Sequence, residues 1–349
     1  MDLTLTKHDV GQLKAKYIAV AGLIASIRQI LLDNEDAQSS QVDTLFKCGI
    51  SLSGGQTKED LFKHIEIGDG YYDIGFYYPK DLEESPQWHY GLIDEESKIN
   101  INALKPGDMS YKFLGHLINH LGFDESLAET IASSAVDWKD QDDQATNGLK
   151  GAENDYYTGL SKSYHCKNRP FDTIEELMLV KGMTPEIFKK IKRYITVFPK
   201  DANASMKINL NTASPIVIHA ASRSIIGEKS DFGSLDAKKS ADSIINHRRG
   251  WDNLDGTADD QFISSISPDG NTQPPQGDTG DKDPTGILGS IYSEGEFGAI
   301  VLTGLNISTA HFFHIKIRAV EASSEAQTLI DVIIQRDGEK LPVVYWHRS

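Results

Sequence analysis

The hydrophobic pattern along the chain predicts a helix, then strands, then a helical block, then strands again. Between residues 7 and 32 apolar side chains recur every three or four positions, which is the period of one helix face. This stripe consists of Leu13, Tyr17, Val20, Ile24, Ile27 and Leu31. A helix with one apolar face needs a sheet or another helix to cover it, so we expect the stripe to pack on the protein's own sheet. The alternative is that it docks on partner subunits.

Alternation of apolar and polar residues predicts an antiparallel sheet. Residues 64–67 and 71–78 alternate on either side of Gly68-Asp69-Gly70, which is a hairpin signal. We expect residues 90–93 and 98–101 to pair around a second turn. Further strands are predicted at residues 297–302, 311–320, 328–335 and 341–346.

Between these strands the pattern becomes helical. Helices are predicted at residues 112–121, 127–138, 174–180, 185–197, 215–226 and 241–249. Thr173 and Glu176 have the spacing of a capping box, Gly182 stops that helix, and Thr184-Pro185 starts the next one. The order predicts an α+β domain formed by residues 1–103 and 286–349. Residues 104–285 are predicted to be an α-helical domain inserted into its sheet.

Two segments before helices resemble each other. Residues 98–103 read Lys-Ile-Asn-Ile-Asn-Ala, and residues 207–213 read Lys-Ile-Asn-Leu-Asn-Thr-Ala. Asparagine can cap the free N–H groups at a helix start, so a shared way of entering a helix explains the echo.

Composition narrows the function classes. The net charge of −16 disfavours phosphate backbones as partners, and we expect no nucleic acid to bind. A transmembrane span needs roughly 20 apolar residues, and the longest stretch, 17–27, is followed at once by Arg28. The first residues are expected to lie inside a longer helix whose membrane anchor is absent from the sequence. Cys48 and Cys166 are either separate thiols or, in an oxidising compartment, a disulfide.

Two acidic clusters are candidate sites for a hard cation. The first consists of Asp137, Asp140, Asp142, Glu153 and Asn154, and the second of Asp252, Asp255, Asp259 and Asp260. Ca²⁺ takes six to eight oxygen ligands in irregular geometry, which such loops can supply. The first cluster is not an EF-hand, because the obligatory glycine position falls on Ala145. Each cluster could instead be a solvated acidic loop.

Candidate catalytic chemistry is sparse. His116 and His120 have a spacing that can hold zinc, but Leu117 stands where a metalloprotease has its glutamate base. No phosphate-binding loop, nucleophile elbow or cysteine nucleophile context occurs in the sequence. We therefore expect the protein not to be an enzyme.

Several segments, in this order and spacing, resemble the K-type minor pseudopilins of type II secretion systems. The segments are residues 91–102, 135–142, 151–157, 167–177, 180–184, 207–214, 312–319 and 344–346. The resemblance implies a pilin-like helix packed on an antiparallel sheet, with calcium bound in an inserted α-domain. It also implies a periplasmic subunit, anchored in the inner membrane, that joins the I and J minor pseudopilins at the pseudopilus tip. Other pseudopilus subunits would be its neighbours.

Two other functions remain open on the residues alone. Residues 171–195 resemble a helix-hairpin-helix unit of the kind that binds DNA, although its turn at Lys181-Gly182-Met183 has a single glycine. The acidic loops also suit a calcium-dependent adhesion module, which does not explain the long helix followed by a sheet and inserted helices.

Overall fold

The computed structural model describes residues 2–35, 45–46, 58–78, 87–107, 110–201, 204–226, 237–253, 263, 305–306, 311–338 and 340–349. The chain forms two compact units. The first, here called the sheet unit, comprises Met1–Glu95, Arg248–Phe262 and Ser308–Ser349. The second, the inserted unit, comprises Glu96–His247 and Ile263–Ile307. The chain therefore enters the inserted unit after Glu95, ahead of the division predicted at residue 103.

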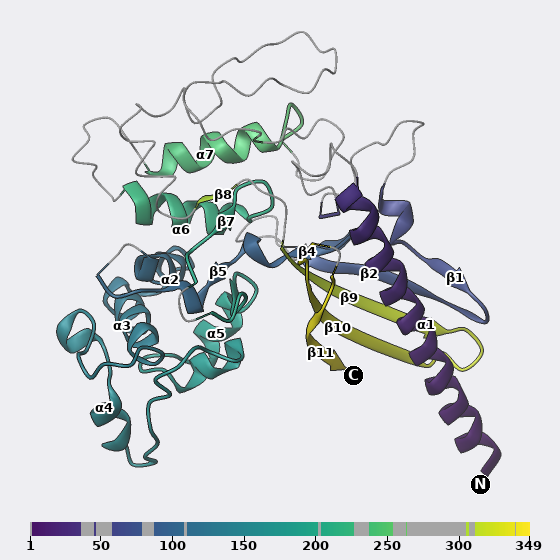
Figure 1. Cartoon of the computed structure of the whole chain (residues 1–349), viewed down its shortest axis with the longest axis horizontal. Coiled ribbons are helices and arrows are strands. Elements are labelled where there is room, and N and C mark those ends of the chain that lie inside the picture. The colour runs from purple at the N-terminus through teal and green to yellow at the C-terminus, as the bar shows by residue number, and fades with distance from the viewer. Residues whose placement is uncertain are drawn as a thin grey trace. The chain divides into compact units, whose positions relative to one another are not determined.

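The sheet unit contains an antiparallel sheet in the order β1-β2-β9-β10-β11 (Figure 1). Its strands are β1 (Ile65–Ile67), β2 (Gly70–Tyr78), β9 (Phe312–Glu321), β10 (Gln327–Gln335) and β11 (Val343–Arg348). The predicted hairpin is confirmed, since Ile67 pairs with Gly70 across the tight turn. Residues 297–302 lie outside the described residues.

The predicted pairing of residues 90–93 with 98–101 is wrong. Strand β3 (Gln87–Tyr90) pairs with β2, and β4 (Ile93–Asp94) pairs with β9. A 3-10 turn, η2 (Glu95–Ser97), follows β4, and β5 (Ile99–Asn100) then pairs in parallel with β6 (Ile195–Thr196) of the inserted unit. The segments are so short that their partners come from distant parts of the chain, which local alternation does not reveal.

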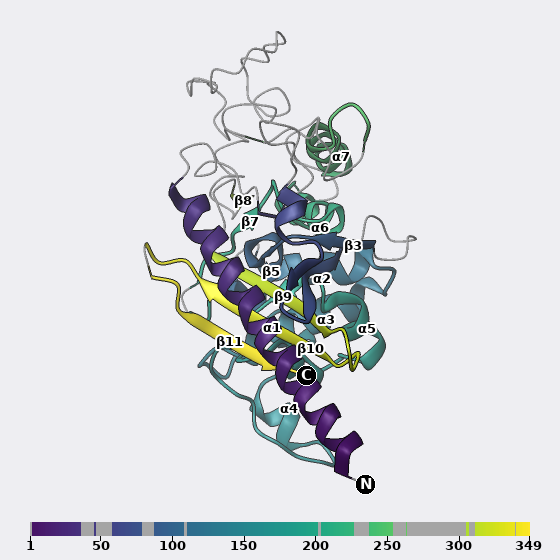
Figure 2. The same ribbon diagram turned by 90° about the vertical axis from the view of Figure 1, so that its right-hand side faces the viewer.

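Helix α1 (Asp2–Glu35) lies across the sheet (Figure 2). Its buried stripe combines small residues with a few large ones: Gly11, Ala15, Ile18, Ala19, Gly22, Leu23, Ser26 and Ile30. Small residues let the helix approach the strands closely. A Cβ added at Gly22 would lie 3.0 Å from side-chain atoms of both Ile317 and Tyr72.

Four of the six residues of the predicted core stripe of α1 face outward, whereas Val20 and Ile27 are partly buried and pack against the core. Leu13, Tyr17, Ile24 and Leu31 are 51%, 64%, 62% and 39% exposed. At 3.6 residues per turn this stripe lies about half a turn around the helix from the buried one. The helix packs on the sheet as expected, but mainly through its small-residue face, which fits the strands more closely than the predicted stripe does. By length and composition alone, Lys7–Asp33 could also cross a membrane, which the sequence reading missed.

The inserted unit is built mainly from helices (Figure 1). Its α-helices are α2 (Ser110–His120), α3 (Glu125–Asp137), α4 (Asn154–Thr158), α5 (Pro185–Ile191), α6 (Pro215–Ile226) and α7 (Ala237–Arg248, whose last residue belongs to the sheet unit). The 3-10 turns are η3 (Ile101–Ala103), η4 (Gly148–Lys150) and η5 (Ile174–Leu179), with η1 (Lys58–Leu61) in the sheet unit. The helix predicted over 185–197 ends early, because residues 195 and 196 become a strand beside β5. The predicted capping box is confirmed at η5.

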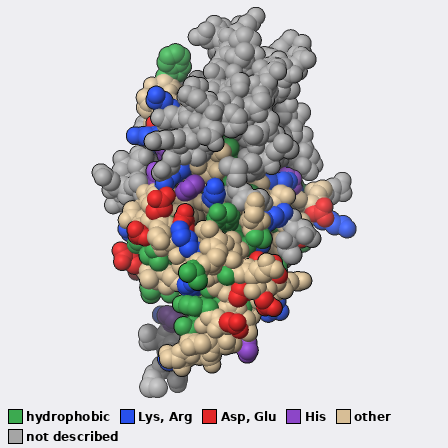
Figure 3. All heavy atoms as spheres, turned by 90° about the vertical axis from the view of Figure 1, so that its left-hand side faces the viewer, with side chains coloured by type: hydrophobic (Ala, Val, Ile, Leu, Met, Phe, Trp, Pro, Cys, Tyr) green, Lys and Arg blue, Asp and Glu red, His purple; other side chains and the backbone are tan. Residues whose placement is uncertain are grey.

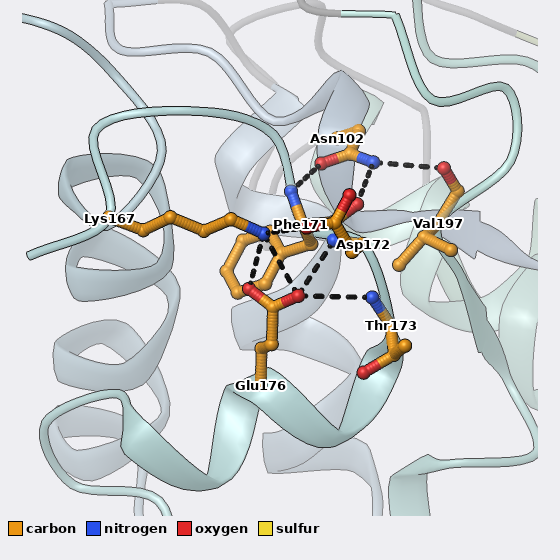
Figure 4. A network of polar contacts seen from close by, with 7 residues as sticks. All are labelled: Asn102, Lys167, Phe171, Asp172, Thr173, Glu176 and Val197. Carbon is orange, nitrogen blue, oxygen red and sulfur yellow. Dashed lines mark hydrogen bonds and ion pairs between the residues drawn. The ribbon is translucent and has the colours of Figure 1, made fainter.

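Asparagine side chains join the segments of the inserted unit. The Asn102 side chain accepts from the N–H of Phe171 at 2.7 Å and donates to the carbonyl oxygens of Phe171 and Val197 at 3.0 and 2.9 Å (Figure 4). In the same figure the Lys167 ammonium contacts Glu176, whose carboxylate caps η5. Asn102 is fully buried.

The echo in sequence corresponds to a repeated arrangement. Asn211 bonds the N–H and carbonyl of Ile263 as Asn102 bonds those of Phe171. Each asparagine follows a two-residue strand with a parallel partner, and the second pair is β7 (Ile208–Asn209) with β8 (Leu305–Asn306). The shared device is thus more than a helix cap, because it ties distant segments together.

Candidate cation site in the inserted unit

Three of the predicted ligands come together between α3 and α4. Oxygen atoms of Asp140, Asp142 and Glu153 all lie within 4.8 Å of one another. Asp140 and Asp142 are in the turn after α3, and Glu153 is the N-cap residue of α4. Among the described residues, this is the one group of histidine, cysteine and carboxylate side chains close enough to share an ion.

The Glu153 carboxylate is buried without a partner. Neither of its oxygens has a hydrogen bond, and the same holds for Asp140 Oδ1. Burial raises the pKa of Glu153 to about 8, and the charges of Asp137, Asp140, Asp142 and Asp143 add to this effect. Burial, followed by the charges of Asp142 and Asp137, raises the pKa of Asp140 to about 6. Close, buried carboxylates need either protons or a cation, and these hard oxygen donors fit Ca²⁺.

Asp137, another predicted ligand, shapes the loop. It is fully buried at the end of α3, and its two oxygens accept from the N–H groups of Thr146 at 2.8 Å and Ala152 at 2.6 Å. A Cβ added at Gly151 would lie 2.1 Å from Asp137 Oδ2, so this close approach requires glycine. Asp137 thus holds the loop that leads into Glu153.

The other predicted ligands include Asn154 and the second acidic cluster. The Asn154 side-chain oxygen accepts from the Cys166 N–H at 3.2 Å and lies 3.1 Å from His165 Nδ1. In the second cluster Asp252 is exposed after α7, and Asp255, Asp259 and Asp260 lie outside the described residues. That cluster stays a prediction.

The other candidate groups have partners of their own. His116 Nδ1 lies 2.9 Å from Ser224 Oγ, and the His120 ring stacks on that of His219 with centroids 5.2 Å apart. The Cys166 thiol donates to the Asp137 carbonyl oxygen, and burial raises its pKa to about 11. Cys48 lies outside the described residues, so the disulfide stays a prediction.

One residue at this site gave no signal in the sequence analysis. Lys181, treated there only as part of a hairpin turn, donates to the carbonyl oxygens of Leu149 at 3.0 Å and Gly151 at 2.9 Å. It has no local motif, because its contacts are to backbone atoms about 30 positions away.

Comparisons with known proteins show what part of the chain around this site is similar to. Residues 97–200 match the family model described as "Type II secretion system (T2SS), protein K". The type II secretion system protein K of Pseudomonas aeruginosa is 28% identical over 146 residues, covering 41% of this chain and 42% of that protein. That of Dickeya chrysanthemi is 32% identical over 136 residues, covering 38% and 34%. Residues 97–200 of this chain are therefore similar to protein K of type II secretion systems.

The matched segment contains most of the inserted unit. It spans Asn102, the cation cluster and Lys181, so the family likeness in sequence is concentrated there. The chain is aligned with about two fifths of the length of the Pseudomonas protein K, and residues 97–200 of the family match lie within the inserted unit.

The fold extends the likeness over the whole chain. The structure of the GspK-GspI-GspJ complex from enterotoxigenic Escherichia coli contains a chain that matches with a TM-score of 0.61 at 16% identity, covering 99% of both chains. The predicted α+β fold, with an N-terminal helix on an antiparallel sheet and an additional set of helices, is confirmed.

Proposed function

We propose that this protein is a structural minor pseudopilin, which acts by assembly and not by turnover. It would join I- and J-type minor pseudopilins at the tip of the pseudopilus and so initiate or cap it for protein export. Its place would be the periplasm, held at the inner membrane by an N-terminal helix. The likeness of residues 97–200 to protein K of type II secretion systems supports the secretion role, and the E. coli chain of similar fold is described in a complex with GspI and GspJ.

The outer stripe of α1 is the observation that carries this proposal. Large apolar side chains cover the outer face of a helix whose inner face already packs on the sheet. A helix that is apolar all round is normally buried, which in a subunit protein means contact with a partner. Tyr17 and Ile24, both more than 60% exposed, lie near the middle of this stripe. A partner helix of similar apolar character fits it.

Reconstitution tests the assembly. The chain should co-elute with the soluble domains of the I and J pseudopilins of the same bacterium in size-exclusion chromatography. A protein concentration of about 10 µM suits complexes whose Kd is micromolar or lower. Absence of a complex would contradict the proposal.

On the face drawn in Figure 3, the described Lys and Arg side chains are interspersed with Asp and Glu. Tight DNA binding that weakens with salt would instead favour the helix-hairpin-helix function.

We further propose that Asp140, Asp142 and Glu153 bind Ca²⁺, which braces the inserted unit. The unpartnered buried oxygens support this. Three carboxylates leave room in the coordination shell for backbone carbonyls and water, which Ca²⁺ accepts more readily than Mg²⁺ does. Calorimetric titration of chelator-treated protein should show saturable Ca²⁺ binding and weaker Mg²⁺ binding. Lack of saturable heat with millimolar Ca²⁺ would exclude the site.

A further inference from the structure

Lys181 contacts three positions of the segment 146–157, which contains Glu153 and is here called the cation loop. Its ammonium donates to the carbonyl oxygens of Leu149 and Gly151 and lies 5.0 Å from the centre of the Tyr156 ring. Its own N–H donates to the Tyr157 hydroxyl at 3.3 Å. No described carboxylate forms an ion pair with it. A lysine satisfied by backbone carbonyls and an aromatic face is placed to fix backbone rather than to balance charge.

Side chains bond both the N–H groups and the carbonyl oxygens of the cation loop backbone. Asp137 accepts two of its N–H groups, and Lys181 donates to two of its carbonyl oxygens. Gly151, which Lys181 bonds, is separated by one residue from Glu153. The position of the buried Glu153 carboxylate therefore depends on both contacts.

We propose that Lys181 is a positioning residue for the cation site: it holds the 149–151 backbone so that the Glu153 carboxylate faces Asp140 and Asp142. This inference rests on the proposed calcium site. Groups that orient ligands without touching the ion typically contribute 10–100-fold to metal affinity.

Charge and position predict opposite effects, which makes the role testable. A nearby ammonium repels Ca²⁺, so removing it should strengthen binding if charge is all that matters. If the position of the loop backbone matters more, Lys181→Met should raise the calorimetric Kd for Ca²⁺ by about 10-fold or more. Methionine keeps an apolar stem beside Tyr156 but donates to neither carbonyl. The Kd of Lys181→Gln, which keeps a neutral donor, should lie between that of the wild type and that of Lys181→Met.

Lys150→Met is the matched control. Lys150 is on the same loop and carries the same charge, but it pairs with Glu129 at the surface. Lys150→Met should leave the Kd for Ca²⁺ unchanged or lower it slightly. The Lys181 proposal is overturned if the wild type binds Ca²⁺ and Lys181→Met and Lys181→Gln bind as tightly as Lys150→Met. A wild type that binds no Ca²⁺ would overturn both this proposal and the calcium site.

Discussion

The two units of the molecule are stabilised by different means. In the sheet unit, small residues on α1 let apolar side chains of the helix and sheet interlock, as at Gly22 between Tyr72 and Ile317. In the inserted unit, buried polar side chains such as Asn102 and Asp137 tie distant backbone segments together. Apolar packing is indifferent to protons and cations, whereas buried polar groups are sensitive to both. We therefore expect the α1–sheet contact to respond to shape and the cation cluster of the inserted unit to respond to solution conditions.

The largest effect is expected for a bulky residue in the α1–sheet contact. Gly22→Leu would force several carbon atoms into a space where a Cβ already meets two side chains at 3.0 Å. The free energy of unfolding should fall by roughly 3 kcal/mol or more, measured by urea denaturation. Ala21→Leu, on the outer side of the helix, is the control and should change it by less than about 0.5 kcal/mol. Equal effects would mean that α1 does not pack closely through Gly22.

The corresponding change in the inserted unit is Asn102→Ala. It leaves the N–H of Phe171 and the carbonyl oxygens of Phe171 and Val197 without their side-chain partner. Because a buried unsatisfied group costs about 1–3 kcal/mol, we expect a loss of about 3 kcal/mol. Amide hydrogen exchange should show loss of protection in α2 and α5 but unchanged protection in β9 and β10. A change below about 0.5 kcal/mol would contradict the role of Asn102.

The sequence predicted the elements better than their contacts. Caps and turns at Thr173, Gly68 and Pro185 act over a few residues, so they could be read directly. The buried face of α1 could not, because Ala15, Ala19 and Gly22 carry no hydrophobic signal beside Tyr17 and Ile24. Helix packing selected the small residues for their fit.

The same limit applies to the cation site. Its acidic residues are close in sequence and were found from spacing. The separate roles of Asp137 and Lys181 depend on which backbone groups the folded loop presents to them, and composition does not encode that.

Calcium should stabilise the inserted unit in particular. If the Kd is about 10 µM, 1 mM Ca²⁺ should add about 2.7 kcal/mol to the free energy of unfolding. Glu153→Gln should abolish this gain, while Glu175→Gln, at an exposed position outside the cluster, should keep it. Thermal unfolding of chelator-treated protein with and without Ca²⁺ measures the difference. An equal gain in both variants would place the ion elsewhere.

Competition between protons and Ca²⁺ makes both the stability of the cation-free protein and its Ca²⁺ affinity depend on pH. Without Ca²⁺, the raised pKa values of Asp140, about 6, and Glu153, about 8, mean that the folded protein holds protons that the unfolded chain has already released. The cation-free stability should therefore fall as pH rises from about 4.5 to 8. Ca²⁺ must displace these protons, so its affinity should rise over pH 6–8. A pH-independent Kd over this range would contradict the account.

A smaller effect of opposite sign is expected from the histidines between α2 and α6. Burial, with Arg223 and Lys112, lowers the pKa of His116 to about 4, and burial also lowers the pKa of His120 and His219. Asp242 opposes this shift at His219, and Lys238 adds to it. The unfolded chain then binds more protons below pH 6.5, so stability falls as pH decreases.

Replacing His116 should remove part of this acid sensitivity. With Ca²⁺ saturating, His116→Asn should reduce the loss between pH 6 and 5 by on the order of 1 kcal/mol. His8→Asn, at an exposed position of α1, should leave it unchanged. The midpoint of urea unfolding at each pH provides the measurement, and identical slopes in all three proteins would contradict the prediction.

One binding measurement most directly tests the proposal that the outer stripe of α1 is where the sheet unit meets its partners. The wild type, Ile24→Glu and Gln12→Glu are each titrated into the I and J soluble domains, since Gln12 is exposed but lies away from the stripe. We predict that Ile24→Glu folds normally and weakens the Kd at least 10-fold, while Gln12→Glu binds like the wild type. Unchanged binding by a folded Ile24→Glu would contradict assembly through this face.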